Sequence, residues 1–337
     1  MTDQRLDKIR ALIQEDVANR GLCRQPIGNM VDSCPGDFAA ACHSIARTQN
    51  AALGVVTGFY IADADPPCGE TDGPLGALFL ARSLMPLGIE VHLITDPFCT
   101  RALAAGLRIC RLEKRVEVLA LPPRPDSWDS FLKGEWRRLA EERKLTHLLA
   151  LERVGPSHTL DSIRAQNARP PEATELFEAE VAEEHRNRCH SMNGRDISDL
   201  MAPAYRLFEN AAECTHIVTI GIGDGGNEIG MGKIAWDIVR RNVARGGVIA
   251  CRVLTDYLIV CGISNWGAYG LAAGVRFLRG AAPDQELFGV EFERELLQIM
   301  VQEGPLVDGV TRKQGLSVDG LAFDRYAEPL RQLADSI

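Results

Sequence analysis

Short apolar runs alternate with polar loops and helical stretches along the chain. Each run is short and largely apolar, which is typical of parallel strands covered on both faces. Apolar spacing between the runs predicts helices over Gly73–Leu87, Asp126–Lys144 and Lys233–Arg245. The predicted strands are Ala52–Thr57, Glu90–Thr95, Val116–Leu121, Thr146–Leu151, His216–Ile220 and Tyr257–Val260. This alternation predicts an α/β fold, with a doubly wound, mostly parallel sheet and helices on both faces.

Two regions depart from the alternation. Residues 153–191 are highly charged and contain no clear strand, so we expect an insertion or lid over one sheet edge. Residues 302–320 contain Val-Asp-Gly twice, and because Asp-Gly is a turn signal we expect a small C-terminal hairpin there. The length of 337 residues suits one large α/β domain, and we assign residues 1–337 to it.

Composition excludes several classes of protein. The net charge of -9 argues against a nucleic-acid surface, which needs clustered Lys and Arg. No apolar stretch approaches the length of a membrane span. The ten cysteines form no CxxC pair, so we expect free thiols. The N-terminal residues resemble an amphipathic helix and not an export signal, so we expect a cytoplasmic protein.

The glycine-rich segment Gly221–Gly232 follows a predicted strand and begins with G-x-G-x-x-G. We expect no nucleotide cofactor, because Asp224 and Glu228 would repel pyrophosphate and no acidic residue about 20 positions later could bind a ribose. Asp224, Asn227 and Glu228 instead offer the oxygen atoms that hard divalent cations prefer. The alternative is a sharp turn whose carboxylates are solvated.

Other polar residues are expected at the same edge, because parallel strands place their carboxyl ends together and ligands bind there. In Cys68–Pro74, Glu70, Thr71 and Asp72 precede a helix, where they serve a site or, in the case of Thr71 or Asp72, simply cap the helix. Arg153 and Arg195 offer a two-point clamp for a carboxylate, although Arg195 could equally pair with Asp196. The expected substrate-binding residues are Thr57, Gly58, Thr71, Arg153, Arg195, Gly225, Gly226, Ser264 and Asn265.

Five motifs together resemble one known family. They are TGFYI from Thr57, GETDGP from Gly69, NGRDIS from Asn193, GIGDGGNEIGMG from Gly221 and SNWGAYGL from Ser264. In this order they resemble the C-terminal domain family of D-glutamate cyclase, as do Arg20-Gly21 and the late Val-Asp-Gly segments. The resemblance implies a carbon–oxygen lyase that converts D-glutamate to 5-oxo-D-proline with loss of water. The animal mitochondrial enzyme has a further N-terminal domain, so a separate partner with that domain is possible.

The chemistry assigns roles to the acidic residues. We expect Asp72, Asp224, Asn227 and Glu228 to be catalytic, with a carboxylate accepting the ammonium proton. We also expect Glu70, Asp72, Asp224 and Glu228 to hold Mg²⁺, Mn²⁺ or Ca²⁺, because these carboxylates would otherwise repel a dicarboxylate substrate. Since glycines supply the shape of the loop, Asp224 and Glu228 are expected to serve the site and not the loop's folding.

Two other functions remain open at this stage. One is a metal-dependent hydrolase of a small phosphorylated or carboxylated metabolite, with the same carboxylates activating water. The other is a non-catalytic sensor or partner subunit. We further expect a small amino acid as substrate, self-association into a homo-oligomer, and no membrane or nucleic-acid partner.

Overall fold

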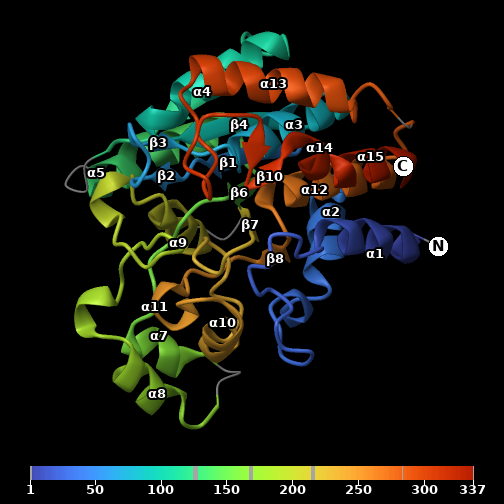
Figure 1. The fold of residues 1–337 in the computed structure, drawn as a ribbon. Coiled ribbons are helices and arrows are strands. Elements are labelled where there is room, and N and C mark those ends of the chain that lie inside the picture. The colour runs from blue at the N-terminus through green and yellow to red at the C-terminus, as the bar shows by residue number, and fades with distance from the viewer. Residues whose placement is uncertain (1, 124–127, 167–169, 214–216, 283, 337) are drawn as a thin grey trace.

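The computed structural model describes residues 2–123, 128–166, 170–213, 217–282 and 284–336, and six parallel strands form its central sheet (Figure 1). The strands are β1 (Ala52–Thr57), β4 (Glu90–Thr95), β5 (Val118–Ala120), β6 (His147–Leu151), β7 (Val218–Gly223) and β8 (Tyr257–Val260). All six predicted strands are therefore present. Two predicted end residues, Asp126 and His216, lie outside the described residues.

The strand order places a crevice at the centre of the sheet. From one edge to the other the order is β5-β4-β1-β6-β7-β8, so the chain first builds outward from β1 and then returns to its other side. The order reverses between β1 and β6, where Thr57 lies opposite Leu151 at the ends of the strands. Ligands of open parallel sheets bind beyond the strand ends at this type of reversal. The residues that follow Thr57 and Leu151 therefore flank the expected site.

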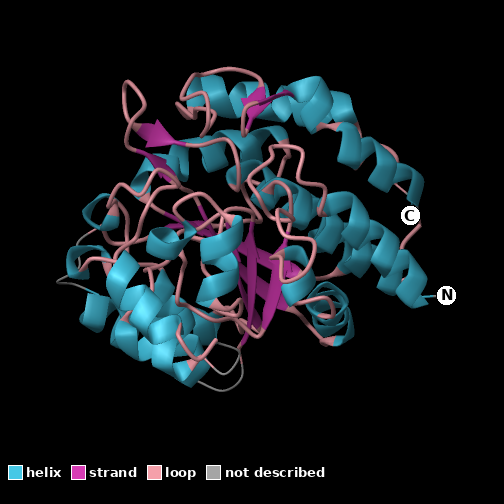
Figure 2. Ribbon diagram, turned by 60° about the horizontal axis from the view of Figure 1, so that its bottom comes forward, coloured by secondary structure: helices cyan, strands magenta, loops and turns pink. Residues whose placement is uncertain are grey.

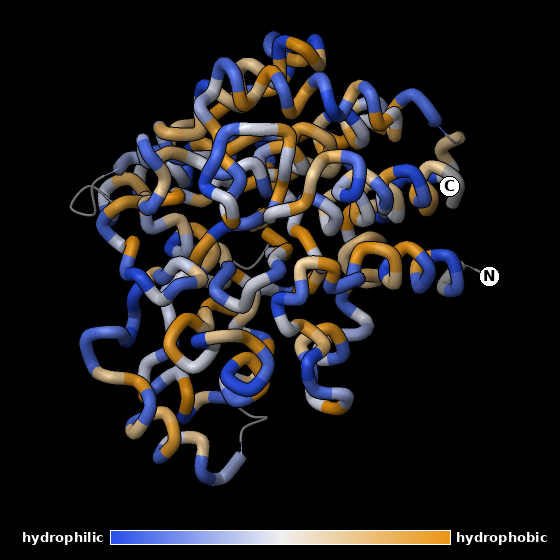
Figure 3. Tube along the Cα trace, viewed as in Figure 1, coloured by the Kyte–Doolittle hydropathy of each residue, from blue (hydrophilic) through white to orange (hydrophobic). Residues whose placement is uncertain are grey.

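One face of the sheet is covered by a large helical layer (Figure 1). It contains α1 (Thr2–Ile13), α2 (Asp37–Arg47), α3 (Pro74–Leu84), α4 (Pro97–Ile109), α12 (Ser264–Leu278), α13 (Val290–Glu303) and α15 (Glu328–Ser336). The central helix α12 packs on α2 and α3, and Leu53 and Val55 of β1 point into this core. The outer helix α13 alternates hydrophilic and hydrophobic turns in Figure 3, because only one side of it faces the core.

Shorter helices cover the opposite face, so the sheet lies between two layers (Figure 2). They are α5 (Trp128–Phe131), α6 (Arg137–Glu142), α7 (Leu160–Ala165), α8 (Ala173–Glu180), α9 (Tyr205–Glu213), α10 (Trp236–Asn242) and α11 (Gly246–Ile249). Leu148 and Val56 point into this second core. A π-helical turn, Leu132–Trp136, separates α5 from α6 where the sequence predicted one continuous helix. The predicted doubly wound α/β fold is confirmed.

The two unusual regions have short elements of their own. Residues 153–191 contain α7 and α8, whose Ile163 and Phe177 are fully buried in the second core. The predicted C-terminal hairpin is present as β9 (Ser317–Val318) and β10 (Leu321–Ala322), followed by α14 (Phe323–Tyr326). A second small hairpin pairs β2 (Tyr60–Ile61) with β3 (Cys68–Gly69). No helix in the described part of the chain has the length and apolarity needed to traverse a bilayer.

Candidate active site

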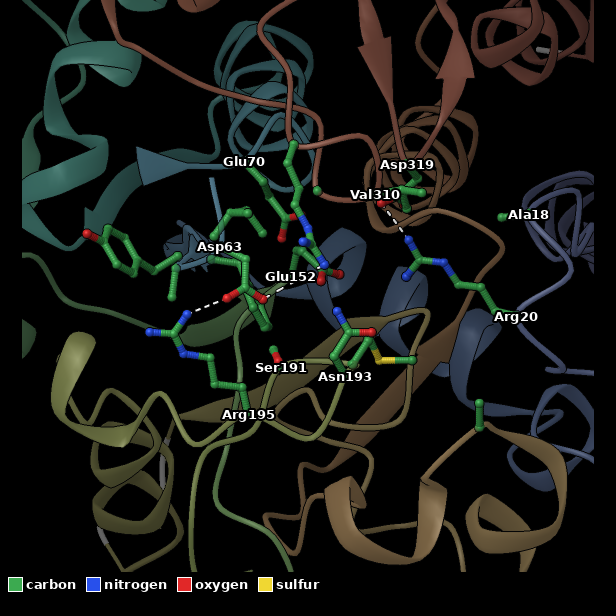
Figure 4. A pocket seen from close by; sticks show the side chains of 18 of the residues that line it. Ala18, Arg20, Asp63, Glu70, Glu152, Ser191, Asn193, Arg195, Val310 and Asp319 are labelled. Atoms are coloured by element: carbon green, nitrogen blue, oxygen red, sulfur yellow. Dashed lines mark hydrogen bonds and ion pairs between the residues drawn. The ribbon is translucent and has the colours of Figure 1, made fainter. Parts of the chain in front are cut away.

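A cavity of about 420 Å³ lies at the carboxyl edge of the sheet (Figure 4). Its wall carries both signs of charge, from segments that are far apart in the sequence. The charged and polar side chains that line it include Arg20, Arg24, Asp63, Glu70, Glu152, Ser191, Arg195, Arg312 and Asp319. Glu152 follows β6 directly, so the cavity opens beside the reversal in strand order. This agrees with the edge at which the sequence predicted a site.

Arg20 is the central cation of the site. Its guanidinium pairs with Asp224 through Nη1, and its Nη2 lies 2.5 Å from Oδ1 of Asp319. Burial by itself would lower the pKa of Arg20, but the carboxylates of Asp224 and Asp319 outweigh it and raise the pKa well above its usual value. Arg20 is therefore a permanent positive charge inside the acidic cluster. The sequence analysis noted this residue only as part of a family motif.

The loop that carries Arg20 is held by Asp16. The carboxylate of Asp16 accepts the backbone N–H groups of Arg20 at 2.8 Å and of Gly21 at 2.9 Å. Gly21 has φ +96°, and a Cβ there would lie 2.2 Å from the carbonyl oxygen of Asn242. Only glycine fits this position, so the short run after α1 directs Arg20 into the site.

Asp72 ties two loops of the site together. Its Oδ1 accepts the N–H of Asn265 at 2.8 Å and of Gly73 at 3.0 Å. Its Oδ2 accepts the N–H of Ser264 at 2.9 Å, at the start of α12. Burial raises the pKa of Asp72, Asp319 raises it further, and the hydrogen bonds from the backbone oppose the shift. Asp72 thus fixes the start of α12 against the loop before α3.

Glu228 has a structural task that the sequence analysis did not foresee. Its Oε1 accepts the N–H groups of Asp224 at 3.0 Å and Gly225 at 2.6 Å. Its Oε2 accepts the N–H of Gly226 at 2.7 Å. The glycine loop is thus folded around this carboxylate, and the expectation that glycines alone supply its shape is wrong. A catalytic role of Glu228 stays a prediction.

Asp224 lies between the glycine loop and Arg20 and is fully buried. Its Oδ2 accepts the N–H of Ser264 at 3.2 Å. Burial raises the pKa of Asp224 well above the usual carboxyl value, Arg20 opposes this, and Glu152 adds to it. Asp224 therefore belongs to one electrostatic unit with Arg20 and is not in the cavity wall.

Glu152 is the carboxylate that faces the cavity next to this unit. Its Oε2 accepts the Ser264 hydroxyl at 2.6 Å, and its backbone has φ +47°. Burial raises the pKa of Glu152 well above its usual value, and Glu228 and Asp72 raise it further. From sequence, Glu152 was expected at the ligand edge as the residue after the fourth predicted strand, but it was not among the predicted site residues. The signal that identifies it is an acidic residue directly after the strand that borders the reversal in strand order.

The acidic side chains form two groups that could hold a cation, each with oxygen atoms within 4.8 Å of one another. One contains Asp72, Asp224 and Asp319, and the other contains Glu152, Asp224 and Glu228. Of the four carboxylates predicted to hold a cation, Asp72, Asp224 and Glu228 lie in these groups of described residues. Glu70 lies in neither group of the described residues, although it lines the cavity, and its pKa is raised by burial and then by Glu152.

Arg153 does not face the cavity. Its guanidinium is fully buried, pairs with Asp96, and donates to the carbonyl oxygens of Gly58 at 2.8 Å and Ala202 at 2.7 Å. These contacts join the loop after β6 to the ends of β1 and β4. With its Nη groups engaged in this way, Arg153 cannot form the predicted clamp in this conformation.

Arg195 does line the cavity. It pairs with Asp63 and not with its neighbour Asp196, which was the alternative from sequence. The Asp196 carboxylate instead accepts the N–H of Ser198 at 2.9 Å and lies 3.8 Å from Arg188. Of the two predicted arginines, only Arg195 can therefore reach a ligand.

The remaining predicted residues lie behind the cavity wall. Asn265 accepts the N–H groups of Gly73 and Gly76, both at 2.8 Å. Asn227 donates to the carbonyl oxygen of His190 at 2.8 Å, and its own Oδ1 is buried without a partner in the described residues. The predicted residues that do not line the cavity are Thr57, Gly58, Thr71, Asp72, Arg153, Asp224, Gly225, Gly226, Asn227, Glu228, Ser264 and Asn265. Sequence reasoning thus found the layer that supports the site more readily than the wall itself.

Comparison with known proteins gives two concordant matches. A family profile described as "D-glutamate cyclase-like, C-terminal" matches residues 9–173 and 164–334. The chain is also 30% identical over 363 residues to the human protein "D-glutamate cyclase, mitochondrial". That match covers 98% of the chain and 52% of the relative, so the chain spans about half the length of this relative.

We predict that Glu228→Gln lowers the free energy of unfolding by about 1–3 kcal/mol, because an amide NH₂ would meet a backbone N–H donor of the glycine loop. Urea unfolding of the purified variant measures this. Glu178→Gln, an exposed change on α8, is the control and should stay within about 0.5 kcal/mol of the parent. A Glu228→Gln protein as stable as the control would contradict the structural task of Glu228.

Proposed function

The chain belongs to the D-glutamate cyclase-like, C-terminal family, and on that premise we propose that it converts D-glutamate to 5-oxo-D-proline with loss of water. The observation that carries the proposal is Glu152, a carboxylate with a raised pKa that lines a cavity next to the permanent cation Arg20. Perturbed titrating groups in a cleft mark catalytic sites. The proposed reaction forms one C–N bond and breaks one C–O bond within a single molecule.

The size and charge of the cavity suit such a substrate. Its volume of about 420 Å³ lies in the lower part of the range of small-molecule sites, roughly 300–1,000 Å³. The wall offers Glu70, Glu152 and Asp319 to an ammonium group and Arg195 to a carboxylate. Oδ2 of Asp319 is buried and has no partner in the described part of the chain. A zwitterion with one ammonium group therefore complements the wall better than a simple anion does.

In the proposed mechanism Glu152 is the general base. The α-ammonium loses a proton to Glu152, and the neutral nitrogen attacks the γ-carboxyl carbon. The oxygen that leaves takes up that proton and the second proton of the amine, and departs as water. Holding both reacting groups of one folded substrate together contributes about 7–11 kcal/mol in favourable cases. A raised pKa makes the Glu152 carboxylate a better proton acceptor than an ordinary solvated carboxylate.

In this proposal Arg20 acts on the reaction indirectly, through the buried carboxylates that it binds. It neutralises Asp224 and Asp319, so that the negative charge nearest the reacting carboxyl group is reduced. Ser264, which donates its hydroxyl to Glu152, positions the base. Asp72 and Asp224 in turn hold the backbone N–H of Ser264. Asp72 and Asp224, two of the four predicted catalytic residues, thus help to position the base.

We also propose that the site accepts a divalent cation. The donor set of Glu152, Asp224 and Glu228 consists of hard carboxylate oxygens, which suits Mg²⁺, Mn²⁺ or Ca²⁺. The group of Asp72, Asp224 and Asp319 fits less well, because Arg20 already binds two of its members. If the group of Glu152, Asp224 and Glu228 held a cation, Glu152 would act as a ligand in place of the general base, and the cation would supply Lewis-acid polarisation of the γ-carboxyl group.

The partner protein, the oligomeric state, the cellular compartment and the alternative activity stay proposals. Because the chain spans about half of its human relative, a separate protein with the other half could complete the enzyme. We propose a homo-oligomer in the cytoplasm, whereas the relative is mitochondrial by its name. No particular feature of the cavity favours a hydrolase over the cyclase.

The functional test is incubation of the purified chain with D-glutamate, with and without divalent ions, followed by chromatography of 5-oxoproline. We expect conversion, with a rate that rises with pH as Glu152 loses its proton. Glu152→Gln should reduce the rate by about 100-fold or more. The exposed variant Glu178→Gln should match the parent. The absence of product under every condition, or an unaffected Glu152→Gln rate, would overturn the proposal.

Removal of metal gives a second prediction. Protein treated with a chelator should lose thermal stability and regain it with Mg²⁺, Mn²⁺ or Ca²⁺. An ion at about 100 times its dissociation constant should add about 2.7 kcal/mol to the free energy of unfolding. Asp224→Asn, which removes a carboxylate shared by both groups, should abolish the gain. If none of the three ions changes the melting temperature of the parent, the cation proposal is wrong.

A further inference from the structure

Asp63 lies in the cavity wall, in the connection between β2 and β3. Its two carboxylate oxygens face arginines from two different segments. Oδ1 pairs with Nη1 of Arg195, and Oδ2 lies 3.8 Å from Nη2 of Arg312. All three side chains line the cavity, and Figure 4 shows Asp63 pointing toward Arg195. A carboxylate from the protein itself therefore occupies the space between two cavity arginines.

The trio of Asp63, Arg195 and Arg312 is more exposed to solvent than the buried ion pairs that stabilise the fold. The side chains of Arg195, Arg312 and Asp63 are 48%, 44% and 33% exposed. Pairs with this exposure contribute only about 0–1 kcal/mol to stability, because water and salt compete for both charges. The pair of Arg153 with Asp96 is the contrasting case, since both side chains are at most 2% exposed. The Asp63 contacts can thus be broken at small cost, and those of Arg153 cannot.

The same part of the wall has further donors that the described residues leave unused. Arg24 lines the cavity, is exposed, and has no ion pair with any described residue. The Ser191 hydroxyl oxygen is buried and has no partner in the described part of the chain. Ser191 also donates its N–H to the carbonyl oxygen of Arg195 at 2.9 Å, so one tight turn presents both residues. We call this part of the wall, formed by Arg24, Ser191, Arg195 and Arg312, the rim of the cavity. Its positive charge and its hydrogen-bond donors exceed what the single carboxylate of Asp63 can pair with.

We propose that Arg195 and Arg312 form a carboxylate subsite, which Asp63 fills as an internal ligand until a carboxylate of the substrate displaces it. The class of ligand is a small α-amino acid, and this identification rests on the proposed function. The acidic side of the wall, with Glu152 and Asp319, receives the ammonium group. The α-carboxylate is the one carboxyl group that cyclisation does not consume. It therefore suits the rim, while the γ-carboxyl group folds inward beside the amine.

The charges explain why an internal ligand is useful here. Two arginines left open at a cavity mouth would bind any small anion of the surroundings, because guanidinium groups form two-point contacts with carboxylates and phosphates. Asp63 competes with such anions. A zwitterion gains a second contact with the acidic wall and therefore displaces Asp63 more readily than a simple anion does. Asp63 thus lowers the affinity for every carboxylate by a similar factor, so that a simple anion no longer fills the subsite while a zwitterion, with its second contact, still does.

The test uses two probes that cannot cyclise to 5-oxoproline, D-norvaline and glutarate, with calorimetric titration into the whole chain. Asp63→Asn should bind each probe about ten-fold more tightly than the parent, and Arg195→Gln added to Asp63→Asn should reverse the gain. Asp196→Asn is the matched control, because it removes one negative charge beside Arg195 but outside the cavity wall. It should change each dissociation constant by less than about two-fold, as expected for screened charges.

Three outcomes would overturn the subsite. These are equal tightening by Asp63→Asn and Asp196→Asn, a gain that survives Arg195→Gln, and the absence of binding of both probes to Asp63→Asn. Circular dichroism of each variant confirms that it is folded. Because neither probe can form 5-oxoproline, the result is separate from turnover. Tight binding to Asp63→Asn without conversion of D-glutamate would support the subsite and refute only the proposed reaction.

Discussion

Several carboxylates are buried together at one edge of the sheet, and the structure depends on the means by which their charge is compensated. An uncompensated buried carboxylate is costly, and two such charges close together are more so. Arg20 supplies the compensating cation by binding Asp224 and Asp319 at once. Backbone N–H groups compensate two others, with three on Asp72 and three on Glu228. The loops around the site take their shape from these contacts.

Glu152 is the carboxylate of the cavity wall that we assign to the chemistry. Glu152 is positioned by the Ser264 hydroxyl and lines the cavity, while burial, and then the neighbouring carboxylates Glu228 and Asp72, keep its pKa high. A base of this kind is what the proposed cyclisation requires. The cavity is also lined by the exposed arginines Arg195 and Arg312, so its charges would complement a small zwitterion. The family identity and the site chemistry therefore point in the same direction, although each rests on different observations.

Sequence reasoning located the sheet and the ligand edge because both follow from local patterns. Apolar runs of strand length identified all six strands, and the polar residues after them identified the edge. Roles within the edge depend on contacts between distant residues, which no local pattern reports. Arg20 is 204 positions from Asp224. Arg153 and Arg195 looked equivalent as clamps, yet one is fully buried and the other lines the cavity. Only the folded chain distinguishes a carboxylate bound by N–H groups, such as Glu228, from one that lines the cavity, such as Glu152.

The most direct test of this account is the stability of Arg20→Gln at two pH values. The buried carboxyl groups have pKa values above their usual range, so their deprotonation destabilises the fold as pH rises above the usual carboxyl pKa. Removing Arg20 takes away the charge that opposes these shifts. Urea unfolding should therefore show a loss of about 3–5 kcal/mol at pH 8 and a smaller loss at pH 5. Arg20→Lys should restore part of the loss at pH 8. A loss that is the same at both pH values would contradict the role of Arg20 as the compensating charge of the site.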